Sequence, residues 1–219
     1  MRKMVFLVAG FVLFVCTLAY AYDDGDFQIW TTAAEEFKMD KNLKLVLEEE
    51  FRWGDDASEF FYQHYDAGVF YSAYKWLNIG AGYRHIYELK KGKFKLENAP
   101  YATATLFFEK DGFAFDTRNR LEYRYFNYQD DAWRYRNKFS LKFPWKFTRM
   151  KLQPYISDEI LISFGADKNG LNQNRLAPGL GINITDNVKA EIYYMLVSTK
   201  SSGKWSDANV LGTKLKVAF

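Results

Sequence analysis

Apolar and charged side chains alternate along short segments of residues 26–219, and turns or loops separate these segments. Each segment has about 10–14 residues, and successive side chains of a strand point to opposite faces, so each predicts a strand with one apolar and one polar face. The clearest segment, 113–125, places Phe113, Phe115, Leu121, Tyr123 and Tyr125 on one face, and Asp116, Arg118, Arg120, Glu122 and Arg124 on the other. The pattern predicts an all-β fold in which antiparallel hairpins wind up and down into one closed barrel.

Connections of two kinds separate the segments. Short turns are expected near Met39–Asn42, Tyr74–Trp76, Lys110–Gly112, Pro144–Arg149 and Thr185–Asn187. Longer loops are expected near Gly54–Ser58, Leu89–Glu97, Asn127–Asp131, Gly165–Gln173 and Lys200–Ala208. This order predicts tight turns at one rim of the barrel and looser loops at the other.

The number of strands stays open between ten and twelve. Eleven segments are found, beginning with Asp26–Lys38, whereas single-chain bacterial membrane barrels have an even number of strands. The first segment has no clear apolar face. Either it lies partly in the lumen and leaves ten wall strands, or the division into segments misses one strand.

The first 21 residues have the features of a cleavable signal peptide. Arg2 and Lys3 form a basic region, Met4 to Leu18 an apolar run, and Ala19-Tyr20-Ala21 a cleavage site. The run is shorter than the ~20 residues of a spanning helix. The only cysteine, Cys16, lies inside it, so the predicted mature chain has no disulfide and no thiol nucleophile. We therefore expect a signal peptide at 1–21 and one barrel domain at 22–219.

Composition favours a barrel in lipid over a soluble one. Aromatic residues make up 19% of the chain, yet its mean hydropathy is −0.34. A membrane barrel can expose aromatic side chains to lipid around a polar lumen. A soluble periplasmic lipid-binding barrel, with the apolar face inward, is the alternative. Tryptophans near the segment ends suit an interfacial girdle: Trp53, Trp76, Trp133, Trp145 and, in a predicted loop, Trp205.

Net charge argues against a polyanionic partner. Loss of the signal peptide leaves 28 of the 30 basic residues against 27 acidic ones. We expect no nucleic-acid binding from so balanced a chain.

The charged faces hold the candidate functional residues. We expect these side chains to line the lumen: Arg84, Glu88, Arg118, Arg120, Glu122, Arg124, Arg134, Arg136, Glu159 and Arg175. They would form either a selective pore or anion site, or a structural filling in which arginines pair with carboxylates. Because both signs are plentiful and arginine forks match carboxylates, the filling is favoured.

Catalysis is not expected. Neither His64 nor His85 has a serine two residues on or follows an aspartate, as outer-membrane phospholipases or barrel proteases would require. His85 falls on the apolar face near a loop. Two isolated histidines do not form a zinc site, and the calcium-like Asp167–Asn172 lacks its glutamate, so no metal or cofactor is expected. An outer-membrane lipid-modifying enzyme remains the alternative.

Several stretches resemble an uncharacterised family of bacterial outer-membrane barrels, a domain of unknown function common in Bacteroidetes. They are Gly82-Tyr83-Arg84, Arg118 to Arg124, Trp133 to Arg136, Ser157 to Ile160 and Asn174-Arg175-Leu176. The resemblance implies an integral protein of the Gram-negative outer membrane, porin-like in build, and it supplies no activity.

The final strand resembles the signal that the barrel-assembly machinery reads, which favours a terminal aromatic, here Phe219. The usual glycine five residues before the end is replaced by Lys214, with Gly212 two residues earlier. The expected partners are this machinery, periplasmic chaperones, outer-membrane lipid and lipopolysaccharide. We expect a non-catalytic monomer with a structural role, or one that passes small solutes only.

Overall fold

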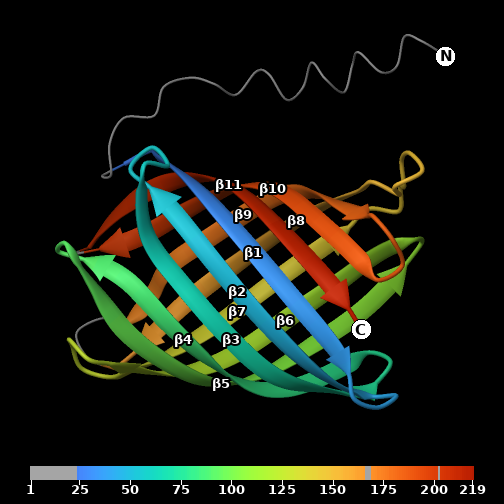
Figure 1. The fold of residues 1–219 in the computed structure, drawn as a ribbon, viewed down its shortest axis with the longest axis horizontal. Helices are drawn as coiled ribbons and strands as arrows, with labels where there is room; N and C mark the ends of the chain where they lie inside the picture. The colour runs from blue at the N-terminus through green and yellow to red at the C-terminus, as the bar shows by residue number, and fades with distance from the viewer. Residues whose placement is uncertain (1–23, 166–168, 202) are drawn as a thin grey trace, which may run out of the picture.

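A computed structural model describes residues 24–165, 169–201 and 203–219. These residues form eleven strands and one closed barrel (Figure 1). The strands are β1 (Asp26–Lys38), β2 (Leu43–Gly54), β3 (Glu59–Tyr74), β4 (Leu77–Lys90), β5 (Lys93–Lys110), β6 (Phe113–Phe126), β7 (Ala132–Lys142), β8 (Gln153–Phe164), β9 (Gly170–Asn183), β10 (Val188–Ser201) and β11 (Lys204–Ala218). Within the described ranges no helix is long and apolar enough to cross a membrane. The predicted signal peptide at 1–21 lies outside the described residues.

The strand count settles the question of the first segment. β1 is a full wall strand that pairs with β2 on one side and β11 on the other, so the alternative that places it in the lumen is wrong. Its pairing with β11 is parallel, and the other neighbouring pairs are antiparallel. Figure 1 shows β1 and β11 side by side, running in the same direction. Successive hairpins alternate in direction, so closing an odd number of strands requires one parallel pair.

Two predicted loops are wrong, because the strands continue through them. β4 and β5 pair as far as Lys90 and Lys93, across a turn of Lys91 and Gly92 with φ of 54° and 71°. Positive φ at both turn residues is typical of a tight hairpin turn, which leaves no loop at Leu89–Glu97. β10 and β11 likewise pair up to Ser201 and Lys204 within the predicted loop Lys200–Ala208.

The expected contrast between the two rims is also wrong. The connection from β7 to β8, residues 143–152, is longer than the predicted turn Pro144–Arg149, and it lies at the rim expected to carry only tight turns. An isolated bridge pairs Phe147 with Leu152 inside this connection, so it forms a small hairpin of its own. The rim of the predicted loops has a two-residue turn at 91–92.

The barrel has its apolar face outside and its charged face inside. Leu121 is 45% exposed, whereas its neighbour Glu122 is 1% exposed. The same alternation holds around the wall, so large apolar side chains cover the outside and buried charged side chains fill the lumen. This is the reverse of a soluble barrel, whose apolar side chains face inward.

Inward-facing tyrosines cover glycines on the neighbouring strand. Tyr193 on β10 lies directly opposite Gly212 on β11, and a Cβ at Gly212 would lie 2.0 Å from the tyrosine ring. Tyr101 covers Gly82 in the same way, with 2.4 Å to the ring. Only glycine leaves room for an aromatic ring to lie flat against the wall at these positions. The rings of Tyr193 and Tyr101 therefore pack against the inner surface of the barrel wall.

Candidate functional site

Glu159 on β8 is the central acceptor of the lumen. Both of its carboxylate oxygens lie 2.9 Å from Nη2 of Arg136 on β7. Oε1 also accepts a hydrogen bond from Nη2 of Arg118 at 2.8 Å, and Oε2 lies 3.5 Å from Nη1 of Arg175. Glu159 is only 5% exposed. Guanidinium groups from three other strands therefore stabilise one buried carboxylate.

A second carboxylate continues the network along β6. Glu122 accepts hydrogen bonds from Nε of Arg134 and, at 3.2 Å, from Nη1 of Arg136. Arg136 thus bridges Glu122 and Glu159. Nearer the rim, Arg124 donates two parallel hydrogen bonds to Glu97, of 2.5 Å and 2.7 Å. This two-pronged arrangement is the strongest geometry that an arginine and a carboxylate can form.

Asp66 on β3 holds Arg84 but leaves Arg120 loosely paired. Arg84 donates a hydrogen bond from Nε to Asp66 Oδ2 at 2.9 Å, and its Nη2 lies 2.8 Å from the same oxygen as an ion pair. The Tyr101 hydroxyl donates to Oδ1 at 2.6 Å. Nη1 of Arg120 is 3.6 Å from Asp66 and 3.9 Å from Glu122. Among the described residues, Nε and Nη1 of Arg120 have no hydrogen-bond partner, and its guanidinium lies 3.8 Å from the Tyr101 ring centre.

Two glutamates of β2 complete the network. Glu50 accepts hydrogen bonds from Nε of Arg52 at 2.7 Å and from the Thr32 hydroxyl at 3.0 Å. Glu48 accepts one from Nζ of Lys214 on β11 at 2.6 Å. This ion pair spans β1, which lies between β2 and β11 in the wall. The position that departs from the usual assembly signal, Lys214, is a lumen cation.

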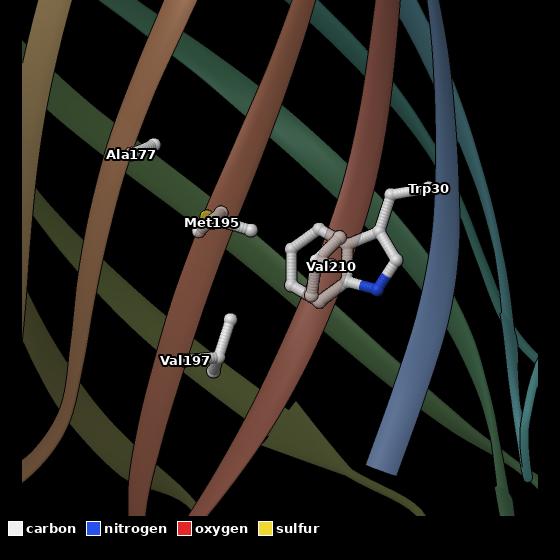
Figure 2. Packing of buried hydrophobic residues seen from close by; sticks show 5 residues of the cluster. All are labelled: Trp30, Ala177, Met195, Val197 and Val210. Carbon is white, nitrogen blue, oxygen red and sulfur yellow. The ribbon is translucent and has the colours of Figure 1, made fainter. Parts of the chain in front are cut away.

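An apolar cluster occupies the wall near the parallel seam. It comprises Trp30, Ala177, Met195, Val197 and Val210, from β1, β9, β10 and β11 (Figure 2). The guanidinium carbon of Arg52 lies 3.5 Å from the Trp30 ring centre and 3.9 Å from that of Tyr62. A cation held between two aromatic faces is stabilised by both rings. The sixth tryptophan, Trp30, is therefore a lumen residue, apart from the predicted girdle.

Two small cavities lie in the lumen beside the network. One has a volume of about 120 Å³ and is lined by residues that include Lys138, Glu191 and Lys214. The other, of about 220 Å³, lies nearer the rim of the β4–β5 and β6–β7 connections and is lined by residues that include Glu88 and Arg124. Four arginines line both cavities: Arg52, Arg84, Arg136 and Arg175. These four arginine side chains form a layer at the boundary that the two cavities share.

All ten candidate residues face the lumen, but they are not equivalent. Glu88 pairs with Lys90 at 2.9 Å near the rim, and both side chains are about one-third exposed. The acceptors Asp66 and Glu97 were not among the predicted residues. Glu97 fell at the end of the wrongly predicted loop, where no face was assigned. Continued alternation through Lys93–Asn98 would have placed it on the charged face.

The two histidines occupy different surroundings. His64 is 1% exposed in the lumen, where Nδ1 lies 3.1 Å from the Tyr62 hydroxyl and Nε2 lies 3.5 Å from Glu48. His85 lies on the outer face, as alternation predicts, with Nδ1 2.6 Å from Asn98 Oδ1. The described part of the chain holds no group of three His, Cys, Asp or Glu side chains that could bind a metal ion. The loop Asp167–Asn172 lies partly outside the described residues.

Fold and lumen together define a closed all-β barrel with an apolar outside and a salt-bridged interior. The chain belongs to a family described as protein of unknown function (DUF2490), whose model matches residues 27–208. The predicted membership of an uncharacterised family is therefore confirmed. Comparison with curated proteins and with solved structures gives no match.

Proposed function

We propose that this chain is an integral outer-membrane barrel without catalytic activity, whose lumen is closed by ion pairs. Its role is structural, or it passes small solutes only. The observation that carries the proposal is the reversed polarity of the barrel: exposed Leu121 beside fully buried Glu122, repeated around the wall. In water that outer surface would be an apolar patch far larger than soluble proteins expose.

Aromatic side chains support a membrane setting. Trp76 and Trp145 lie in connections at one rim and are 54% and 55% exposed. Trp133 and Trp205, each the second residue of its strand, are exposed near the opposite rim. Tryptophan is enriched at the two interfaces of membrane barrels. The strands, of 11 to 18 residues, exceed the ~9–11 that a tilted strand needs to cross a bilayer.

The interior supports a closed lumen. The layer of four arginines between the two cavities is held by carboxylates and aromatic rings, as in the pairing of Arg136 with Glu159. The 120 Å³ cavity has seven basic lining residues (Arg52, Arg84, Arg118, Arg136, Lys138, Arg175 and Lys214) and four acidic ones (Glu48, Glu50, Glu159 and Glu191). A solute that enters would therefore be small and anionic.

Export, assembly and the absence of catalysis are parts of the same proposal. A signal peptide at 1–21 would deliver the chain to the periplasm, and the assembly machinery and chaperones would insert it among outer-membrane lipid and lipopolysaccharide. His64 contacts the Tyr62 hydroxyl and Glu48, and His85 on the outer face contacts Asn98 and the Tyr87 hydroxyl, so neither histidine is paired with a serine or threonine.

Gel mobility and fractionation test the membrane setting. Unboiled protein should run faster than boiled protein, because a closed barrel stays compact in detergent, and it should fractionate with the envelope. Recovery as a soluble periplasmic protein would contradict the proposal and favour the soluble alternative.

A further inference from the structure

The outer face of β6–β9 carries polar side chains in the middle of its strands. This outer polar patch consists of Thr117, Asn119, Asn137, Asp158 and Asn174. Each of them lies between neighbours in sequence whose side chains face the lumen. Asp158, for example, lies between Ser157 and Glu159, which are 3% and 5% exposed. The patch therefore points outward, away from the ion-pair network.

The patch is partly satisfied by hydrogen bonds within itself. Nδ2 of Asn137 donates to Thr117 Oγ1 at 3.0 Å and to Asn119 Oδ1 at 2.9 Å. On the next strand pair, Nδ2 of Asn174 donates to Asp158 Oδ1 at 2.7 Å. Across strands, Ile160 lies directly opposite both Asn137 and Asn174. One isoleucine thus separates two hydrogen-bonded polar groups on an otherwise apolar wall.

Lipid hydrocarbon would leave the polar groups of this patch without hydrogen-bond partners. Asp158 is the sixth residue of the twelve in β8, and Asn137 is the sixth of the eleven in β7, so both lie half-way along their strands. A carboxylate and amides at that depth would face hydrocarbon, which offers no hydrogen bonds. Ionisable side chains at such depth mark functional sites. A protein surface with polar groups at the same depth would satisfy them.

A second copy of the chain supplies such a surface. All copies share one depth and orientation in a membrane, so a twofold axis along the membrane normal would bring each patch against its equivalent. Amide groups both donate and accept, and Asp158 accepts, so the patch is complementary to itself. Among the described outward-facing residues at mid-strand, none is Lys or Arg, and Glu49 on the far wall is another acceptor. The β6–β9 face gathers three amides and a carboxylate on four neighbouring strands, whereas Tyr194 and Asn209 on β10 and β11 form a smaller outward polar pair near mid-strand.

We propose that the protein forms a symmetric dimer in the membrane through the outer polar patch, with Ile160 near the twofold axis. The proposal replaces the monomer expected from sequence, and it rests on the membrane setting proposed above. Exposed Leu121, Phe139, Ile156 and Leu176 surround the patch and would form the apolar rim of the interface.

Crosslinking tests the dimer. The mature chain has no native cysteine if the signal peptide containing Cys16 is removed. Ile160→Cys should therefore give a disulfide-linked band at twice the barrel mass when outer membranes are treated with copper phenanthroline. Leu47→Cys, outward and mid-strand on the far wall, is the matched control and should give at least tenfold less. Equal crosslinking at both sites would overturn the proposal. A crosslinked band whose mass is that of one barrel plus a different protein would also overturn it.

Substitution of the patch adds a second readout. In the Ile160→Cys background, Asn137→Leu with Asn174→Leu should reduce crosslinking at least tenfold and leave the heat-dependent gel shift unchanged. Thr213→Leu, outward on β11, should leave both unchanged. A heat-modifiable membrane barrel that does not crosslink at Ile160 would overturn the dimer alone. A soluble chain would overturn the membrane setting as well.

Discussion

Nη2 of Arg136 lies 2.9 Å from each carboxylate oxygen of Glu159, deep inside the barrel. Arg136 also donates to Glu122 at 3.2 Å, so one guanidinium joins two buried carboxylates from the strands on either side of its own. If this guanidinium left its partners, buried charges would be left unpaired inside the barrel, which is costly. This relationship supports the proposed closed lumen, because the charged side chains inside the barrel hold one another in place.

Removal of Glu159 should destabilise the barrel. Glu159→Gln leaves Arg118, Arg136 and Arg175 facing one another without their common anion. We expect the free energy of unfolding to fall by about 3–5 kcal/mol. Urea unfolding in lipid vesicles, followed by tryptophan fluorescence, measures this loss.

Arg120 provides the matched control, because it is buried to the same degree but lacks close hydrogen-bonded carboxylates. Arg120→Met should change the free energy of unfolding by less than about 1 kcal/mol, because a loosely paired buried charge returns little of its desolvation cost. Equal losses for Arg120→Met and Glu159→Gln would show that the hydrogen-bond geometry does not determine stability here.

Gly212 should not tolerate a side chain. A Cβ there would meet the Tyr193 ring at 2.0 Å, so Gly212→Ala must displace the tyrosine from the wall. We expect a loss of about 1–3 kcal/mol of stability and less folded barrel on gels. Gly181→Ala is the control, since its Cβ would meet only Gln153 O at 3.7 Å. Equal folding of the two variants would contradict the tyrosine-over-glycine packing.

The stack of Phe219 on Phe37 should matter for closure. The two rings lie 5.1 Å apart at 10°, and Phe219 N donates to Glu36 O at 2.8 Å across the parallel seam. Phe219→Ala and Phe37→Ala both remove the stack, and both should slow refolding of purified protein into vesicles. Loss of assembly in cells for Phe219→Ala alone would show recognition of the last residue by the assembly machinery. Unchanged assembly and refolding in both variants would remove any role for this contact.

Alternation predicted which side chains face outward from the wall and which face the lumen, because the two-residue period depends only on the backbone of a strand. It worked best at 113–125, where Asp116, Arg118, Arg120, Glu122 and Arg124 occupy every second position, and it failed at Leu89–Glu97. There three lysines around Gly92 resembled a loop, although both sides continue the pattern. The residues that were wrongly predicted as a loop include Glu97, the partner of Arg124.

Other features depend on contacts between distant strands. The parallel pairing of β1 with β11 joins the two ends of the barrel and leaves no local pattern. The lumen position of Trp30 follows from its strand face, but the first segment is too weakly amphipathic to assign that face. Which arginine is well paired depends on register, and Arg120 and Arg136 look alike in the sequence.

Conductance in a planar bilayer tests the closed lumen most directly. The purified protein should stay electrically silent across a range of voltages if, as proposed, the arginines held by carboxylates and aromatic rings at the boundary of the two cavities close the lumen. Replacing Arg84, Arg136 and Arg175 together by alanine should open small conductance steps if that variant inserts as a heat-modifiable barrel. Lys204→Ala, at the rim, should remain silent. Large and steady conductance from the unmutated protein would contradict the account, because an open channel cannot pass through a lumen held shut by its own ion pairs.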